Sequence, residues 1–104
     1  MESILKAKEI SFAEKTLMEN LKIPSSILME NAGAKSAEMI CNIALKHNCD
    51  NILILLGKGN NAGDGMVISR HILSKNFKPI NFFLYPSTNF KNDAKTNYDI
   101  LKNI

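Results

Sequence analysis

An unbroken apolar run that leads into a glycine-rich segment constrains the fold of this chain more than any other feature. Residues 51–56 read Asn-Ile-Leu-Ile-Leu-Leu, and they are bounded by Asp50 and Gly57. A short run of this kind is typical of a strand buried on both faces of a parallel sheet, so we expect a central strand. Residues 57–65 contain four glycines, and we expect them to form a loop that opens a helix.

Helices are predicted where apolar residues recur at spacings of three and four. A first helix is expected to end near residue 22, before Pro24; its apolar face consists of Ile10, Ala13, Leu17 and Leu21. Ser25 or Ser26 is expected to cap a second helix over residues 27–47. Small side chains along this second helix predict close packing on a neighbouring backbone; its seam is Met29, Gly33, Ala37, Ile40 and Ala44.

The second half of the chain continues the same alternation. A helix is expected after the glycines, then a strand over residues 79–84, a turn at residues 86–89, and a closing helix through Ala94, Tyr98 and Leu101. Helices that alternate with apolar strands predict a parallel sheet with right-handed crossovers. We therefore expect the α/β class, as a Rossmann-like three-layer α/β/α arrangement with residues 1–104 in one unit.

Composition excludes several classes of protein. The 104 residues are 45% hydrophobic and 22% charged, as in an ordinary globular chain of one domain or less. The net charge of +3 is spread along the sequence, so no nucleic-acid partner is expected. No run approaches the ~20 apolar residues of a membrane span, and the N-terminus resembles no signal peptide. Cys41 and Cys49 lack the spacing of a zinc site, and we expect reduced thiols in a cytoplasmic protein.

The glycine-rich segment is the candidate site. A strand, a loop and a helix in this order put backbone N–H groups at the carboxyl edge of the sheet, where ligands bind. Asn60, Asn61 and Asp64 add two amides and a carboxylate within five residues, more than a tight turn requires. A plain turn that needs glycine, with Asp64 as a helix cap, is the competing interpretation.

Two familiar phosphate-binding loops can be compared with this segment. The Walker pattern ends in Gly-Lys-Ser/Thr, whereas this segment ends Gly63-Asp64-Gly65, so a P-loop nucleotidase is excluded. Residues 57–62 satisfy the dinucleotide pattern G-x-G-x-x-A. That pattern requires an acidic residue near the end of the next strand, and residues 84–87 read Leu-Tyr-Pro-Ser. An ordinary dehydrogenase is therefore disfavoured.

Two motifs of this chain match the pattern of one protein family. Residues 57–72, Gly-Lys-Gly-Asn-Asn-Ala-Gly-Asp-Gly followed by Met-Val-Ile-Ser-Arg-His-Ile, are similar to the family pattern G-x-G-N-N-G-G-D-G-hydrophobic-V-x-x-R-H-L. Residues 23–33 are similar to its I-P-x-x-x-L-M-E-N-A-G segment. In these motifs the chain resembles the YjeF N-terminal family of NAD(P)HX epimerases, and the resemblance covers nearly the whole chain but only about the first half of a family domain.

The resemblance implies an isomerase of nicotinamide-nucleotide repair that interconverts the R and S forms of NADHX and NADPHX. A companion ADP- or ATP-dependent dehydratase then restores the cofactor, and a homodimer is implied for the complete protein. The family's potassium ligand in this segment corresponds to Asn61. Its substrate-contacting residues correspond to Asn60, Asn61, Ala62, Gly63 and Asp64. Met29, Glu30 and Asn31 are expected to support this segment from the preceding helix.

Departures from the family pattern leave other interpretations open. Lys58 stands where the family usually has proline, and Ala62 replaces a glycine, which is costly if that position needs a positive φ. The family's later potassium ligand, second substrate loop and catalytic aspartate correspond to positions beyond residue 104, so the catalytic residue is unknown. A non-catalytic binding module and an inactive truncated fragment are the alternatives. His71 is expected to be structural, and Arg70 and Lys75 are expected to be solvated.

Overall fold

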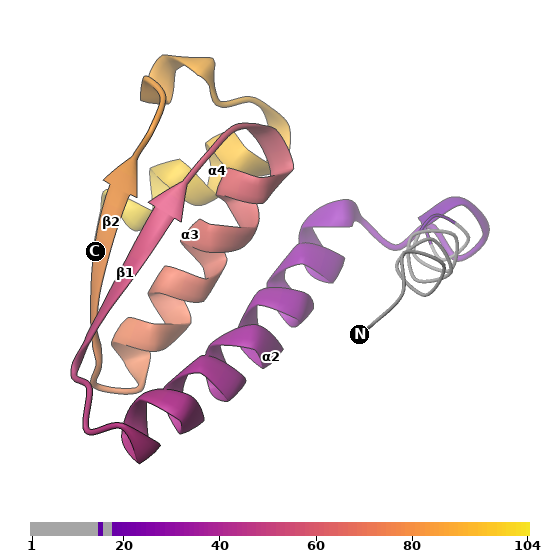
Figure 1. The fold of residues 1–104 in the computed structure, drawn as a ribbon. Coiled ribbons are helices and arrows are strands. Elements are labelled where there is room, and N and C mark those ends of the chain that lie inside the picture. The colour runs from indigo at the N-terminus through magenta and orange to yellow at the C-terminus, as the bar shows by residue number, and fades with distance from the viewer. Residues whose placement is uncertain (1–14, 16–17) are drawn as a thin grey trace, which may run out of the picture.

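The computed structural model describes residue 15 and residues 18–104 (Figure 1). In chain order the elements are α2 (Ser25–Lys46), β1 (Asn51–Leu56), α3 (Gly59–Ser74), β2 (Lys78–Phe83), the short 3₁₀ helix η1 (Ser87–Asn89) and α4 (Asn92–Leu101). The expected first helix lies largely outside the described residues. Within the described part of the chain, no helix is both long and apolar enough to cross a membrane.

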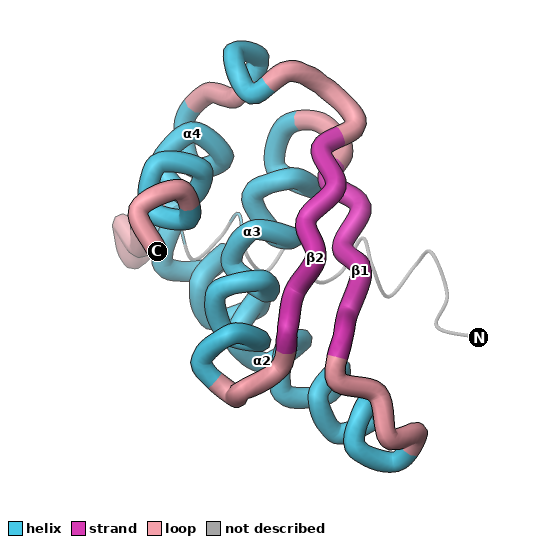
Figure 2. The backbone as a smooth tube through the Cα atoms, turned by 90° about the vertical axis from the view of Figure 1, so that its left-hand side faces the viewer, coloured by secondary structure: helices cyan, strands magenta, loops and turns pink. Residues whose placement is uncertain are grey.

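The two strands form a parallel sheet, as the alternation of elements predicts. Asn51 pairs with Lys78 at one end of the ladder, and Leu56 pairs with Phe83 at the other. In Figure 1, α3 and α2 lie to one side of the strands, and in Figure 2, turned by 90°, the strands stand in front of these helices. Ile52, Ile54 and Leu56 of β1 point to that side and pack against the helices. The α/β class with a parallel sheet is therefore confirmed, and the described residues supply one helical layer.

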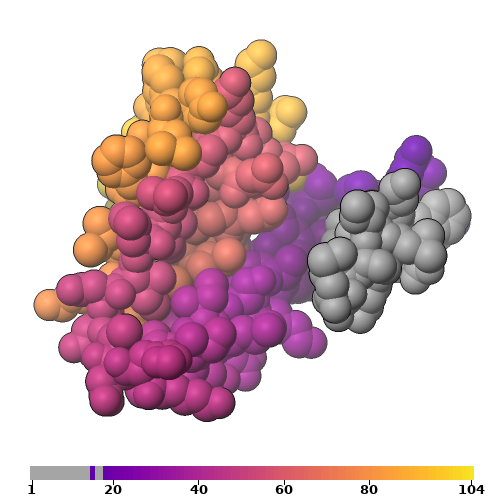
Figure 3. Space-filling model, viewed as in Figure 1, coloured from indigo at the N-terminus to yellow at the C-terminus, as the bar shows by residue number. Residues whose placement is uncertain are grey.

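The opposite side of the sheet is uncovered by the described residues, so the expectation that β1 is buried on both faces is wrong for this part of the chain. Leu53 and Leu55 are 62% and 61% exposed, and their partners Ile80 and Phe82 are 51% and 56% exposed. These four residues are called the open face of the sheet. Both strands lie at the surface in Figure 3. Alternation along a strand turns every second side chain away from the helices.

The seam predicted for α2 is confirmed. Met29, Gly33, Ala37 and Ala44 are buried together with Cys41, and the fifth predicted residue, Ile40, is partly buried against the same core. Gly33 brings α2 very close to α3, because a Cβ built on it would lie 2.3 Å from Cγ1 of Val67. The small residues of the seam therefore serve close packing of these two helices. Burial raises the pKa of the Cys41 thiol, and Cys41 and Cys49 are both free thiols.

Helix α4 closes the core beside α3. Leu56, Ala62, Met66, Phe90 and Ala94 form a buried cluster there, with Tyr98 and Leu101 partly buried against it. The rings of Phe90 and Tyr98 lie 5.5 Å apart between centroids, a distance at which aromatic pairs attract one another. The apolar face predicted for the closing helix is thus the face that packs.

The ends of the helices differ from the sequence-based expectation in one respect. Pro24, rather than Ser25 or Ser26, occupies the N-cap position of α2, and no side chain caps the helix. The Ser25 hydroxyl donates instead to Asp93 of α4, at 2.5 Å. Asn48 after α2 and Asn76 after α3 have positive φ values of 54° and 68°, the left-handed conformation that commonly ends helices.

The open face of the sheet predicts that the 104-residue chain self-associates. Four large apolar side chains in contact with water favour association because burying them releases about 25 cal/mol per Å². Sedimentation velocity over a range of concentrations should show species larger than a monomer. The double change Leu53→Lys with Phe82→Lys should reduce them, whereas Leu45→Lys, at an exposed leucine on α2, should not. A wild-type monomer with a sharp, cooperative thermal transition would contradict this prediction.

Candidate functional site

Helix α3 begins earlier than the glycine content suggests. Its first residue is Gly59 and its N-cap is Lys58, so only Gly57 and Lys58 separate it from β1. The expectation of a loop over residues 57–65 is therefore wrong. Gly59 has a φ of 57°, which a residue with a side chain adopts only with strain. The candidate residues 60–64 consequently lie in the first two turns of a helix.

The later glycines of this segment lie within a helix, against neighbouring elements, rather than in a turn. A Cβ on Gly63 would lie 2.9 Å from Sδ of Met29 and 3.3 Å from Cα of Ala94. One on Gly65 would lie 2.6 Å from Cδ2 of Leu56. Helices α2 and α4 and strand β1 therefore all approach the start of α3 closely. Met29 supports this segment, as expected.

The two departures from the family pattern have structural roles. Ala62 is completely buried in the core cluster beside α4, and its φ is negative, so its Cβ costs no backbone strain. The amine of Lys58 lies 4.5 Å from the centroid of the Tyr85 ring, a cation–π contact. The core cluster thus accommodates the methyl group of Ala62, and the Tyr85 ring accommodates the charge of Lys58.

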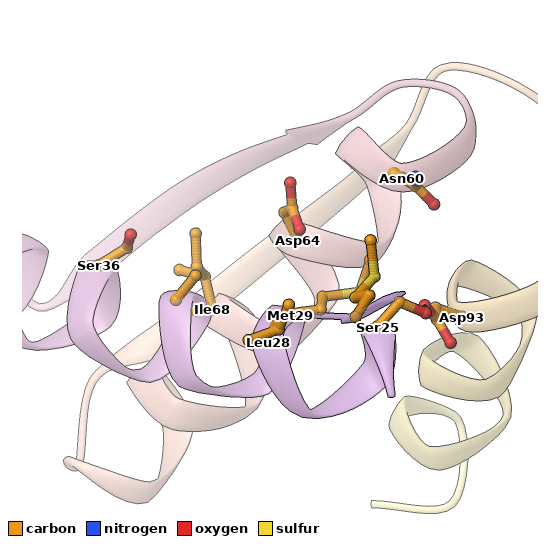
Figure 4. Close-up of a pocket in the computed structure, with 11 residues that line it drawn as sticks. Ser25, Leu28, Met29, Ser36, Asn60, Asp64, Ile68 and Asp93 are labelled. Atoms are coloured by element: carbon orange, nitrogen blue, oxygen red, sulfur yellow. Dashed lines mark hydrogen bonds between the residues drawn. The ribbon is translucent and has the colours of Figure 1, made fainter. Parts of the chain in front are cut away.

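A groove with a volume of about 460 Å³ runs between α2 and α3 and reaches the start of α4. Figure 4 shows Asn60, Asp64 and Ile68 along α3, with Leu28, Met29 and Ser36 along α2. The described residues that line it are Met18, Ser25, Leu28, Met29, Ala32, Gly33, Ser36, Asn60, Asp64, Ile68 and Asp93. The volume lies within the ~300–1,000 Å³ of typical ligand pockets.

The groove brings together some of the predicted substrate residues and leaves others outside. Asn60 and Asp64 are exposed and line it one helical turn apart. Asn61 is exposed but does not line the groove, and the buried Ala62 and Gly63 face the core. Asn31 is exposed outside the groove. Of the predicted substrate residues, only Asn60 and Asp64 therefore have side chains that can contact a ligand in the groove.

An ion-pair cluster lies beside the groove and joins the three helices. Glu30 of α2 accepts a hydrogen bond from Arg70 Nη2 of α3 at 2.5 Å, and its other oxygen lies 2.5 Å from His71 Nε2. Arg70 also donates to Asn97 Oδ1 of α4 at 3.0 Å. The Arg70 side chain is 17% exposed, so the expectation that Arg70 is solvated is wrong. His71 has the structural partner that was expected.

The cluster also supports the floor of the groove. The Asn97 amide donates to Asp93 O at 2.9 Å and contacts Sδ of Met29 at 3.5 Å, and Met29 lines the groove. The hydrogen bond from Arg70 is the main cause that lowers the pKa of Glu30, with a smaller effect from His71. The charged form of Glu30 is thus stabilised in the folded chain.

This pKa shift predicts how stability depends on pH. Because the pKa of Glu30 falls on folding, its contribution is present above its ordinary value of 4.5 and is lost as the pH falls through the lower folded value. Glu30→Gln should lower the free energy of unfolding at pH 7. It should also make that free energy fall less between pH 7 and pH 4. Urea denaturation at pH 7 and pH 4 measures both effects. Glu38→Gln, at an exposed position of the same helix, is the control, and an equal result for the two variants would contradict the assignment.

Comparison with known proteins decides the family. Residues 25–104 match the model of the family described as YjeF-related protein N-terminus. The chain belongs to this family. The match includes every element from α2 to α4 and all residues of the groove except Met18. The groove is therefore part of a YjeF-related domain, as the two sequence motifs indicated.

Three relatives of this YjeF-related chain are informative. It is 35% identical over 102 residues to the bifunctional NAD(P)H-hydrate repair enzyme Nnr of Moorella thermoacetica, covering 93% of this chain and 18% of that protein. It is 53% identical over 55 residues to the NAD(P)H-hydrate epimerase of Rhodopirellula baltica, covering 53% and 21%. It is 35% identical over 89 residues to the chloroplastic pyridoxine/pyridoxamine 5'-phosphate oxidase 1 of Arabidopsis thaliana, covering 86% and 16%. The aligned part is about one fifth of each relative.

Proposed function

We propose that the protein containing this chain is an NAD(P)H-hydrate epimerase, which interconverts the R and S forms of NADHX and NADPHX. Family membership over residues 25–104 carries the proposal, and relatives named NAD(P)H-hydrate epimerase support it. The groove between α2 and α3 supplies a site with the dimensions of a ligand pocket.

In this proposal the start of α3 binds and orients the substrate. Asp64 accepts hydrogen bonds, and Asn60 both donates and accepts them, so together they can hold the hydroxyl and carboxamide groups of a hydrated nicotinamide ring. Met29 and Gly63 keep α2 and α3 close behind these side chains. Binding and orientation are the roles assigned to the described residues, and the catalytic residue stays unassigned.

Potassium is proposed as a bound ion, with Asn61 as one of its ligands. The Asn61 side chain is exposed in the first turn of α3, and an amide oxygen suits a hard cation. One side chain does not hold a potassium ion, and the described residues contain no group of three or more His, Cys, Asp or Glu that could hold a metal. Asn61 therefore fits as a contributor, and no chemical step is assigned to the ion.

Asn61→Ala is expected to abolish any preference of the intact protein for potassium over sodium. The loss of one oxygen ligand removes a contact whose strength depends on the size of the ion. Epimerisation rates in matched potassium and sodium buffers measure the preference. Asn42→Ala, at an exposed asparagine of α2, is the matched control. A preference that persists in Asn61→Ala would remove Asn61 from the ion site.

The proposed activity implies partners of defined chemistry. A dehydratase that uses ADP or ATP would consume the S form, and relatives named bifunctional repair enzymes are consistent with such a companion. A homodimer and a cytoplasmic location belong to the same proposal. The relative named as an oxidase favours a second candidate, a binding module attached to another enzyme.

Catalysed interconversion of the two epimers distinguishes these candidates. Purified R-NADHX is incubated with the intact protein, and the S form is quantified by chromatography against the spontaneous rate. The epimerase proposal predicts equilibration that is faster than the spontaneous reaction and proportional to protein concentration. The binding-module candidate predicts the spontaneous rate at every protein concentration.

A further inference from the structure

A single buried amide on α4 joins α4 to both of the other long helices. Asn97 is 5% exposed, and its Oδ1 accepts a hydrogen bond from Nη2 of Arg70 on α3 at 3.0 Å. Its Nδ2 donates to the carbonyl oxygen of Asp93 at 2.9 Å and lies 3.5 Å from Sδ of Met29 on α2. Both ends of the amide are therefore engaged, as buried polar groups require.

The contact with Arg70 determines which way this amide points. A guanidinium group only donates hydrogen bonds, so the oxygen of Asn97 faces Arg70 and its NH2 group faces the other way. Arg70 is held in turn by the carboxylate of Glu30 on α2, at 2.5 Å. The NH2 group of Asn97 is thereby directed at the backbone oxygen of Asp93 and the sulfur of Met29, both of which can accept.

Both residues that the NH2 group contacts belong to the groove. Met29 and Asp93 line it, whereas Asn97 does not. The Asp93 carboxylate also accepts a hydrogen bond from the hydroxyl of Ser25, another lining residue, at 2.5 Å. Figure 4 shows Ser25 and Asp93 side by side where the start of α2 meets α4. Asn97 thus holds this end of the groove from behind.

We infer that Asn97 is a positioning residue, which sets the shape of the groove where α2 meets α4 and thereby the affinity for the substrate. The inference rests on the proposed function, which names NADPHX as the substrate. It assigns no contact between Asn97 and that substrate. The loss of this support should weaken substrate binding more than it slows the chemical step, because it changes the binding groove and no reacting group.

Asn97→Asp in the intact protein tests this role with a side chain of nearly the same size. The new carboxylate can still accept from Arg70, but it cannot donate to Asp93 or Met29. KM for NADPHX is expected to rise about tenfold while kcat changes by less than about twofold, as when binding common to the ground state and the transition state is lost. A variant that is merely less folded would show a lower kcat with an unchanged KM.

Asn103→Asp is the matched control. Asn103 is exposed just after α4, and its Nδ2 donates to the carbonyl oxygen of Asp99 at 2.9 Å, the same contact four residues back that Asn97 makes. Asn103 lies outside the groove, so Asn103→Asp should leave KM and kcat unchanged. An unchanged KM in Asn97→Asp, or an equal rise of KM in the two variants, would overturn the inference.

A measurement on the unsubstituted protein remains decisive even if Asn97→Asp does not fold. Addition of NADPHX should shift the NMR signals of the Asn97 amide protons, without nuclear Overhauser contacts between these protons and the ligand. The amide signals of Asn103 should stay in place. Unshifted Asn97 signals, or an Overhauser contact with the ligand, would overturn the positioning role.

The proposed function can fail separately from this inference. A protein that binds NADPHX without speeding epimerisation would reject the proposed function. Titration calorimetry on the same two variants would then decide the inference, which predicts that NADPHX affinity falls about tenfold in Asn97→Asp and stays unchanged in Asn103→Asp. Equal affinities of the two variants would overturn it.

Discussion

Gly33→Ala should lower the free energy of unfolding by about 3 kcal/mol or more, the upper part of the range for overpacked cores. The added Cβ would lie 2.3 Å from Cγ1 and 2.8 Å from Cβ of Val67. Neither atom is the end of a flexible side chain, so α2 and α3 must move apart. This separation would also widen the groove that they form. Urea denaturation measures the loss.

Gly57→Ala is the matched control for this change. A Cβ at Gly57 would meet nothing within 4 Å, and Gly57 does not have a positive φ. Its effect should therefore stay within about 0.5 kcal/mol, as is usual for sites without such contacts. Adding Val67→Ala to Gly33→Ala should recover part of the loss, because it removes the closest atom. Equal stability of Gly33→Ala and Gly57→Ala would show that α2 and α3 are not in close contact.

Asp64→Ala should weaken NADPHX binding to the intact protein about 10- to 100-fold, the equivalent of a lost hydrogen bond to a charged group. Asp64 lines the groove and is exposed, and its proposed role is to accept hydrogen bonds from the substrate. Because the side chain lies outside the buried clusters, the fold should remain intact. Titration calorimetry gives the affinity, and circular dichroism checks the fold.

Asp50→Ala provides the comparison for that experiment. Asp50 is exposed in the connection between α2 and β1, away from the groove, and the change removes the same charge. It should leave the affinity for NADPHX unchanged. If the two variants bind equally well, Asp64 does not belong to the substrate site.

The elements that sequence predicted best are those whose packing follows a simple period. The seam of α2 and the apolar face of α4 repeat every three or four residues, so the buried side could be identified without knowing its partner. The start of α3 was predicted worse, because four glycines in residues 57–65 are typical of a loop. Gly63 and Gly65 instead accommodate Met29 and Leu56, neighbours that no local pattern specifies.

In the candidate site, too, the features that follow from local sequence could be predicted, and those that depend on distant residues could not. Asn60 and Asp64 could be selected from the chain because polar residues crowd a strand-to-helix junction. The Glu30–Arg70 pair joins residues 40 positions apart. No periodic pattern in the sequence predicts a charged pair at that separation. The direction of the groove also depends on how α2 crosses α3. Where the two helices approach each other, Gly33 lies against Val67.

A crystal structure of the intact protein bound to NADPHX would test the central claim most directly, namely that the start of α3 holds the substrate. The account predicts ligand atoms within hydrogen-bonding distance of Asn60 or Asp64 and in contact with the groove between α2 and α3. A bound ligand that contacts none of residues 60–64 would contradict it.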